Sequence, residues 1–177
     1  MTDMTVKRSQ LAETHTLAVL VENKAGVLAR VAGLFARRGF NIESLAVAPT
    51  DERFSRITIV VDVEKAPLDQ IVKQLFKLIN VVEIAEMVPE ASLVRELIVV
   101  NVRIEEAQRD ELLTTVERLH GRILLEANGH VMVSLAGEPH EIDAIERELG
   151  EFDIFDIQRT GKVALRIVGN DLPLTRA

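Results

Sequence analysis

Two asparagines flank one amphipathic segment near the N-terminus, and their side chains are suited to binding a small polar ligand. Asn23 lies just before Gly26, where the segment begins, and Asn41 follows Gly39, where it ends. A carboxamide offers both a donor and an acceptor, so it can bind an ammonium group as well as a carboxylate. A glycine at a helix start exposes backbone N–H groups, and the helix dipole favours an anion there.

The apolar neighbours of these residues narrow the expected ligand to a small apolar amino acid. These neighbours are Val27, Leu28, Ile42 and Val47. A second interpretation stays open for Asn23, because Asn is a favoured helix N-cap residue. Capping explains little at Asn41, which precedes a predicted strand.

Other kinds of site chemistry have little support in the sequence. The chain has no cysteine, which excludes a disulfide framework, a thiolate metal site and a catalytic thiol. Nucleotide-binding and nucleophile-elbow glycine motifs are absent. The four histidines have no i, i+4 pairing, so we expect polar surface histidines rather than a metal site. They are His15, His120, His130 and His140.

Composition indicates a globular protein that is neither a nucleic-acid nor a membrane protein. The chain has 177 residues, of which 47% are hydrophobic and 28% charged, and its net charge is −7. An acidic chain without Trp or Tyr lacks the basic surface and the stacking platforms that nucleic acids need. No apolar run approaches the ~18 residues of a membrane span. We expect a cytoplasmic protein with a flexible lead-in over residues 1–13.

Strand and helix patterns alternate along the first half of the chain. Residues 14–21 are apolar throughout, which predicts a strand in the middle of a sheet. A helix is expected over 26–38, ended by Gly39. Pro67 is expected at the first position of a second helix, 68–79. Further strands are predicted at 40–49, 56–63 and 81–88, which completes the β-α-β-β-α-β order of ferredoxin-like domains.

The same order starts again after a boundary at Pro89-Glu90. Strands are predicted at 93–104, 122–127, 130–136 and 152–159, and helices at 110–120 and 140–149. Asn128-Gly129 predicts a tight hairpin turn. The expected fold is therefore α+β, with two tandem ferredoxin-like (βαββαβ) domains at 14–89 and 90–177. Each is expected to be a four-stranded antiparallel sheet with two helices on one face.

The repeat separates residues needed for folding from residues that could bind a ligand. An offset of 82 residues places Gly39 on Gly121, which predicts that Gly121 ends the third helix. At this offset Asn23, Gly26 and Asn41 fall on Glu105, Gln108 and Ile123. The second copy thus lacks both asparagines and the helix-start glycine, which favours a binding role for them in the first copy.

The segment LVENKAGVLARVAGLFARRGFNIESLAVAPTDERFSRITIVV closely resembles the N-terminal ACT domain of acetolactate synthase (acetohydroxyacid synthase) small subunits. The run GFNIESLAVAPT is its most specific part. The resemblance continues through QIVKQLFKLINVVEI and, more weakly, through RELIVVNVRI and RTGKVALRIVG. It therefore covers nearly the whole chain.

This resemblance implies a regulatory subunit of branched-chain amino acid synthesis that is not catalytic alone. Such a homodimer would bind valine, or another branched-chain amino acid, between paired ACT domains, activate the catalytic (large) subunit and confer feedback inhibition. Thiamine diphosphate, magnesium and FAD would belong to the catalytic subunit, and the second domain is a candidate contact for it. The effector site predicted from matching positions and their neighbours comprises Asn23, Ala25, Gly26, Val27, Leu28, Asn41, Ile42 and Val47.

Two alternatives from other functional classes stay open at this point. One is a tandem ACT-domain transcriptional regulator that responds to an amino acid, which a basic DNA-binding segment would favour. The other is a stand-alone enzyme on a ferredoxin-like scaffold, which would need polar residues converging on an open sheet face. The predicted strands are apolar, and no basic segment is visible.

Overall fold

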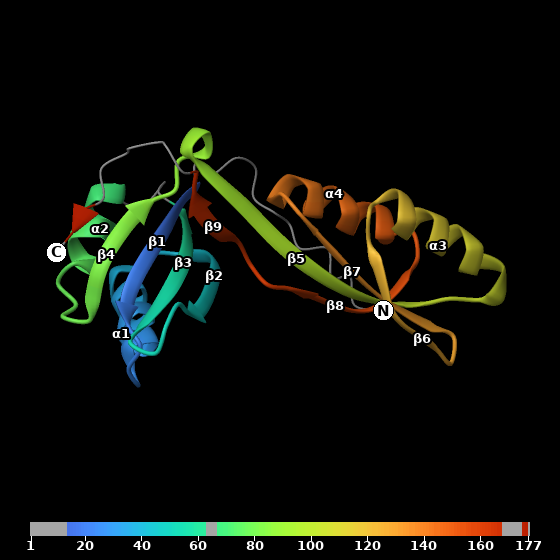
Figure 1. The fold of residues 1–177 in the computed structure, drawn as a ribbon, viewed down its shortest axis with the longest axis horizontal. Helices are drawn as coiled ribbons and strands as arrows, with labels where there is room; N and C mark the ends of the chain where they lie inside the picture. Colours follow the sequence, from blue (N-terminus) through green and yellow to red (C-terminus); the bar gives the residue numbers. More distant parts are fainter. Residues whose placement is uncertain (1–13, 63–66, 168–174, 177) are drawn as a thin grey trace. The chain divides into compact units, whose positions relative to one another are not determined.

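A computed structural model describes residues 14–62, 67–167 and 175–176 (Figure 1). The chain divides between Ala91 and Ser92 into two compact units, which we call unit 1 and unit 2. The two-residue strand β10 (Thr175–Arg176) pairs with a strand of unit 1, although the sequence assigned all of 90–177 to the second domain. The predicted lead-in, 1–13, lies outside the described residues.

Unit 1 has the predicted βαββαβ order. Its elements are β1 (Thr14–Glu22), α1 (Val27–Arg38), β2 (Ile42–Pro49), β3 (Phe54–Asp62), α2 (Leu68–Leu75), β4 (Val81–Glu86) and a 3-10 turn (Pro89–Ala91). The antiparallel sheet has the order β10-β4-β1-β3-β2, so β1 is central as its apolar sequence predicted. α2 ends at Leu75, earlier than expected, and Pro67 is its N-cap rather than its first helical residue.

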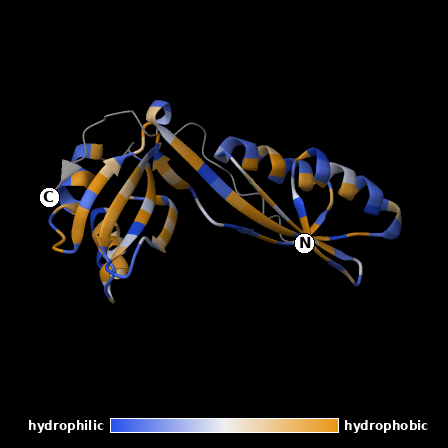
Figure 2. Ribbon diagram, viewed as in Figure 1, coloured by the Kyte–Doolittle hydropathy of each residue, from blue (hydrophilic) through white to orange (hydrophobic). Residues whose placement is uncertain are grey.

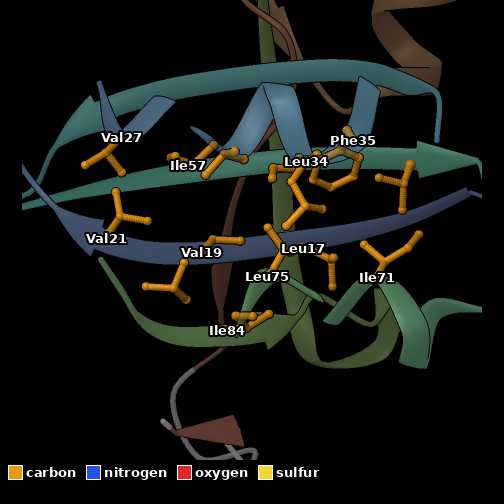
Figure 3. Close-up of a cluster of buried hydrophobic side chains, with 14 residues drawn as sticks. Leu17, Val19, Val21, Val27, Leu34, Phe35, Ile57, Ile71, Leu75 and Ile84 are labelled. Atoms are coloured by element: carbon orange, nitrogen blue, oxygen red, sulfur yellow. The ribbon is translucent and has the colours of Figure 1, made fainter. Parts of the chain in front are cut away.

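The core of unit 1 lies between the sheet and its two helices. Alternate residues of β1 point toward the helices, and the apolar face of α1 covers them, as its spacing predicted. Figure 3 shows these side chains converging from strands and helices. The opposite sides of β1 and β3 are also buried, at Ala18, Thr58 and Val60. Core residues labelled in the figure are Leu17, Val19, Val21, Val27, Leu34, Phe35, Ile57, Ile71, Leu75 and Ile84.

Unit 2 repeats the fold. Its elements are β5 (Ser92–Arg103), a 3-10 turn η2 (Glu106–Gln108), α3 (Arg109–Arg118), β6 (Arg122–Ala127), β7 (His130–Gly137), α4 (Pro139–Leu149), β8 (Asp153–Arg159) and β9 (Val163–Arg166). The sheet order β6-β7-β5-β8 matches β2-β3-β1-β4, and β9 pairs with the start of β5. Figure 2 shows α3 and α4 as mainly hydrophilic, with narrower hydrophobic bands. Strands β9 and β10 were not predicted from the sequence.

The predicted offset between the two copies is wrong by one residue over the first strand and helix. The buried residues Val31 and Phe35 of α1 correspond to Leu112 and Val116 of α3, an offset of 81. At this offset Gly39 (φ 67°) matches His120 (φ 56°), and both have the left-handed conformation that ends a helix.

The predicted role of Gly121 as the residue that ends the third helix is therefore also wrong. A Cβ atom at Gly121 would lie 2.9 Å from side-chain atoms of Leu135 and Val116, so the glycine is needed for close packing. The tight turn predicted at Asn128-Gly129 is confirmed by positive φ angles of 52° and 73°.

One charged cluster stabilises unit 2 from within. The Arg159 guanidinium on β8 donates to both carboxylate oxygens of Glu96, at 2.9 and 2.6 Å. It also donates to Asp143 at 2.9 Å and to Glu146 at 2.8 Å on α4. Glu96 is only 5% exposed, so its charge depends on this arginine. Hydrogen bonding to Glu96 is the main cause that raises the pKa of Arg159.

Candidate effector site

The loop between β1 and α1 brings a glycine to the helix start in a conformation that glycine adopts readily. Gly26 is the N-cap of α1 and has φ 82°, in the left-handed region. Its carbonyl accepts a hydrogen bond from the Arg30 N–H at 3.0 Å, and the Val27 N–H donates to the Lys24 carbonyl. No atom of the described residues lies within 4 Å of a Cβ built at Gly26, so these residues leave the space beside it open.

The N-terminus of α1 has no neutralising partner among the described residues. None of their side chains accepts a hydrogen bond at this cap, and no acidic residue lies in the first turn. The last turn carries Arg37 and Arg38, which suit the negative end of the dipole. The other three α-helices in the described part of the chain each have an acidic residue in the first turn. The start of α1 can therefore accept an external anion.

Neither candidate asparagine acts as a helix cap. The backbone N–H of Asn23 donates to the Arg53 carbonyl at 2.7 Å, and its exposed side chain makes no hydrogen bond within the described residues. The N-cap interpretation of Asn23 is therefore wrong. Asn41 is also exposed, and its amide donates to the Glu43 carboxylate two residues along the chain. Both carboxamides thus face solvent and are accessible to a ligand.

A single copy of unit 1 does not bring the two asparagines together. In the β1–β3 ladder Glu22, the neighbour of Asn23, faces Phe54. In the β2–β3 ladder Ile42, the neighbour of Asn41, faces Val61. Phe54 and Val61 are separated by about 23 Å of extended strand, at ~3.3 Å per residue. A small ligand that contacts Asn23 cannot reach Asn41 of the same chain.

The apolar members of the predicted site divide into core and surface residues. Val27 is buried, and Ile42 packs partly against the core. Leu28 on α1 is 43% exposed and Val47 on β2 is 45% exposed. Because β2 is an edge strand, Val47 is an apolar side chain left at the open edge of the sheet, and Leu28 is an exposed apolar residue in the first turn of α1. Ala25, in the loop itself, is exposed.

The corresponding place in unit 2 is closed by the chain's own side chains. At the offset of 81, Asn23 and Gly26 correspond to Ile104 and Ala107. Just before α3, Glu105 and Gln108 form a reciprocal capping box. By strand register, β6 starts at the equivalent of Ala46, so Asn41 has no counterpart in that strand.

An ion pair fills the equivalent space beside this cap. Arg109, the counterpart of Leu28, donates from Nε to Glu126 Oε1 at 2.5 Å and from Nη2 to Oε2 at 3.0 Å. This hydrogen bonding is the main cause that lowers the pKa of Glu126. A cleft of about 410 Å³ adjoins the pair. It is lined by Ile104, Glu106, Arg109, Glu126, Ala127, Asn128, Gly129 and His130.

Two of the four histidines each contact one polar side chain. His15 contacts the Glu86 carboxylate at 2.5 Å, and His130 contacts the Asn101 side chain at 3.2 Å. Among the described residues, no three metal-ligating side chains form a group. No helix within the described ranges has the length and apolar character to cross a membrane.

Unit 1, with its βαββαβ order and open helix start, has the features of the ACT class of regulatory domains. Residues 17–83 match the family described as the AHAS small subunit-like ACT domain. Residues 95–167 match the family described as the small subunit of acetolactate synthase.

Known proteins that are similar along most of their length agree with these matches. The acetolactate synthase small subunit of Mycolicibacterium smegmatis is 44% identical over 153 residues, covering 86% of this chain and 90% of that protein. The probable acetolactate synthase small subunit of Archaeoglobus fulgidus is 41% identical over 152 residues, covering 85% and 95%. The crystal structure of the Thermotoga maritima small subunit superposes with a TM-score of 0.81 at 34% identity, covering 87% of this chain and 97% of that one. This chain therefore belongs to the acetolactate synthase small subunit family.

Proposed function

We propose that this chain activates an acetolactate synthase catalytic subunit and makes it sensitive to feedback inhibition by valine. Its membership of the small subunit family supports the pairing with that subunit. The chain would act in the cytoplasm and contribute no catalytic residue of its own. Thiamine diphosphate, magnesium and FAD would be bound by the catalytic subunit.

The observation that carries the effector site is the uncapped start of α1. A valine carboxylate at Gly26 would receive backbone N–H groups and the positive end of the helix dipole. The dipole contributes ~0.3–1 kcal/mol at an exposed site, and hydrogen bonds to a charged group add ~1.5–3 kcal/mol each. The isopropyl group would pack against Leu28 and Val47, which are otherwise exposed.

The separation of Asn23 from Asn41 supports a site shared by two copies of the chain. In an antiparallel pairing of two β2 edge strands about a two-fold axis, the start of one strand lies beside the end of the other. Pro49, at the end of β2, pairs with Ser55 of β3. The adjacent β3 residue, Phe54, faces Glu22, so the end of β2 lies at the same end of the sheet as Asn23. Asn41 of a second copy would therefore approach Asn23 and Gly26 of the first. We infer that the chain forms a homodimer through unit 1 and that the effector binds between the two copies.

Acetolactate formation by the matching catalytic subunit tests this function directly. The rate is measured with and without the chain, during a titration with L-valine. We expect the chain to raise the rate and L-valine to lower it again. D-Valine is the matched control, because its inverted centre cannot place carboxylate, ammonium and isopropyl groups on the same partners. An unchanged rate in the presence of the chain would refute the role as an activating subunit.

A further inference from the structure

Asn80, between α2 and β4, is a buried polar residue whose side-chain oxygen and nitrogen are both hydrogen-bonded. It is 6% exposed. Its Nδ2 donates to Glu22 Oε2 at 2.5 Å, and its Oδ1 accepts from Arg30 Nη1 at 2.5 Å. Its backbone carbonyl accepts from the Glu22 N–H at 2.9 Å. Both of its side-chain bonds involve a charged partner, and such bonds are stronger than neutral ones.

These contacts lie on either side of the candidate effector loop. Glu22 is the last residue of β1, directly before Asn23. Arg30 lies in the first part of α1, and its backbone N–H donates to the Gly26 carbonyl at 3.0 Å. One side chain therefore ties the strand that enters the loop to the helix that leaves it. We call these three residues, Glu22, Arg30 and Asn80, the loop clamp.

The Glu22 carboxylate is held at both oxygens. Lys24, inside the loop, donates to Glu22 Oε1 at 3.1 Å. The hydrogen bond from Asn80 is the main cause that lowers the pKa of Glu22, followed by the bond from Lys24. Glu22 therefore stays ionised. Its carboxylate oxygens are hydrogen-bonded to Asn80 and Lys24, which offsets the repulsion that its charge would exert on an incoming carboxylate.

The second copy of the fold lacks the clamp, and its first α-helix follows a capped 3-10 turn and carries acidic residues in its first turn. By strand register Asn80 corresponds to Asp153, because Val21 faces Val81 and Val102 faces Ile154. Asp153 is paired with Arg103 at 3.3 Å, and both side chains are largely exposed. At the offset of 81, Arg30 corresponds to Glu111, whose charge cannot replace a guanidinium beside Asp153. The link from strand to helix is thus specific to unit 1.

We propose that Asn80 is a positioning residue for the effector site, which holds the loop of residues 23–26 in its binding conformation without touching the ligand. The inference rests on the proposed function of this loop as an amino-acid site. A loop ordered before binding loses less conformational entropy when the ligand arrives, so its affinity is higher. Removing the clamp should lower affinity although every predicted contact residue is still present.

The test compares Asn80→Ala with Ile79→Ala in the full-length chain. Ile79 is the adjacent residue and is 92% exposed, so its truncation alters the same turn but leaves the clamp intact. L-Valine binding is measured by isothermal titration calorimetry, and loop order by amide hydrogen exchange. We expect Asn80→Ala to weaken valine binding at least about tenfold, equivalent to ~1.4 kcal/mol. Ile79→Ala should stay within about twofold of the native chain, since an isolated exposed side chain contributes little.

Hydrogen exchange separates a positioning role from a general loss of stability. Loss of the clamp should speed exchange in the loop of residues 23–26, while amides of β1 and β3 keep their native rates. Faster exchange throughout unit 1 would mean that Asn80 only supports the core, and would overturn the proposal. Unchanged valine affinity in Asn80→Ala would overturn it as well.

A charge-specific rescue tests the contact itself. Asn80→Asp keeps the size of the side chain but opposes two carboxylates, so it should also weaken binding and loosen the loop. Combining it with Glu22→Gln restores a donor between the two positions and should recover most of the affinity and loop protection. Failure of this rescue would contradict the clamp. If the native chain binds no valine, the proposed function fails, and the exchange rates of the same variants still decide whether Asn80 orders the loop.

Discussion

Replacing Asn41 with alanine should impair the response to valine without disturbing the fold. The Asn41 side chain is exposed, and within the described residues it is hydrogen-bonded to Glu43, another surface residue. Surface substitutions of this kind change the free energy of unfolding by no more than about 0.5 kcal/mol. A larger change in feedback inhibition therefore cannot arise from unfolding.

The magnitude follows from the contact that Asn41 would make across the dimer. A hydrogen bond to a charged ligand group contributes ~1.5–3 kcal/mol. Its loss should raise the valine concentration for half-inhibition about 10- to 150-fold, since 1.4 kcal/mol corresponds to a factor of ten. Activation of the catalytic subunit should persist, because Asn41 is exposed and lies outside the core cluster of unit 1.

The assay is acetolactate formation over a valine titration, paired with thermal unfolding of the isolated chain. Glu43→Ala is the matched control, because it removes the same surface hydrogen bond but leaves the carboxamide in place. If Glu43→Ala reproduces the loss of inhibition, Asn41 acts only through Glu43. Joint loss of activation and inhibition, or a clear fall in Tm, would refute the reasoning by making Asn41 a structural residue.

Three further variants test the interface and the electrostatics. Val47→Lys places a charge on the open edge of β2 and should convert the proposed dimer to monomers in sedimentation velocity; an unchanged mass would exclude this edge as the interface. Arg159→Ala leaves the buried Glu96 unpaired and should lower the free energy of unfolding by ~3–5 kcal/mol in urea titrations. The pKa of Glu126 is lowered in the folded state by Arg109, so its contribution to stability is complete above its ordinary pKa of 4.5 and is lost as pH falls through the folded-state value. The stability difference between the native chain and Glu126→Gln should therefore shrink in acid; a difference that is constant with pH would contradict this linkage.

The fold was largely predictable because its signals are local. The continuous apolar run of β1 correctly predicted a central strand, and α1 has the apolar face that its spacing indicated. The ends of the helices were harder to predict from the sequence. A glycine at the position of Gly121 is typical of a helix end. In the structure His120 adopts the left-handed conformation instead, and Gly121 leaves space for the Leu135 side chain. Only the packing of a distant strand distinguishes these two roles.

The local structure at Gly26 was predictable from the sequence, but the relative placement of the candidate site residues was not. The open helix start at Gly26 follows from the local sequence, and so does the exposure of Asn23. That Asn23 and Asn41 lie at opposite ends of β3 depends on strand register, which a helix flanked by two asparagines does not reveal. Asn80 was missed altogether, because an isolated Asn between a helix and a strand carries no sequence signal. Its proposed role depends on contacts with Arg30 and Glu22, which are 50 and 58 positions away in the sequence.

The open start of α1 would also couple the stability of unit 1 to the concentration of its proposed effector. In unit 2, the capping box of Glu105 and Gln108 closes the 3-10 turn that leads into α3, and Asp110 and Glu111 lie in the first turn of that helix. Unit 1 leaves Gly26 open, and a bound amino acid would add RT ln(1 + [L]/Kd), or ~2.7 kcal/mol at a concentration 100 times Kd. Without a bound amino acid, unit 1 would open more often and be cut more readily by a protease.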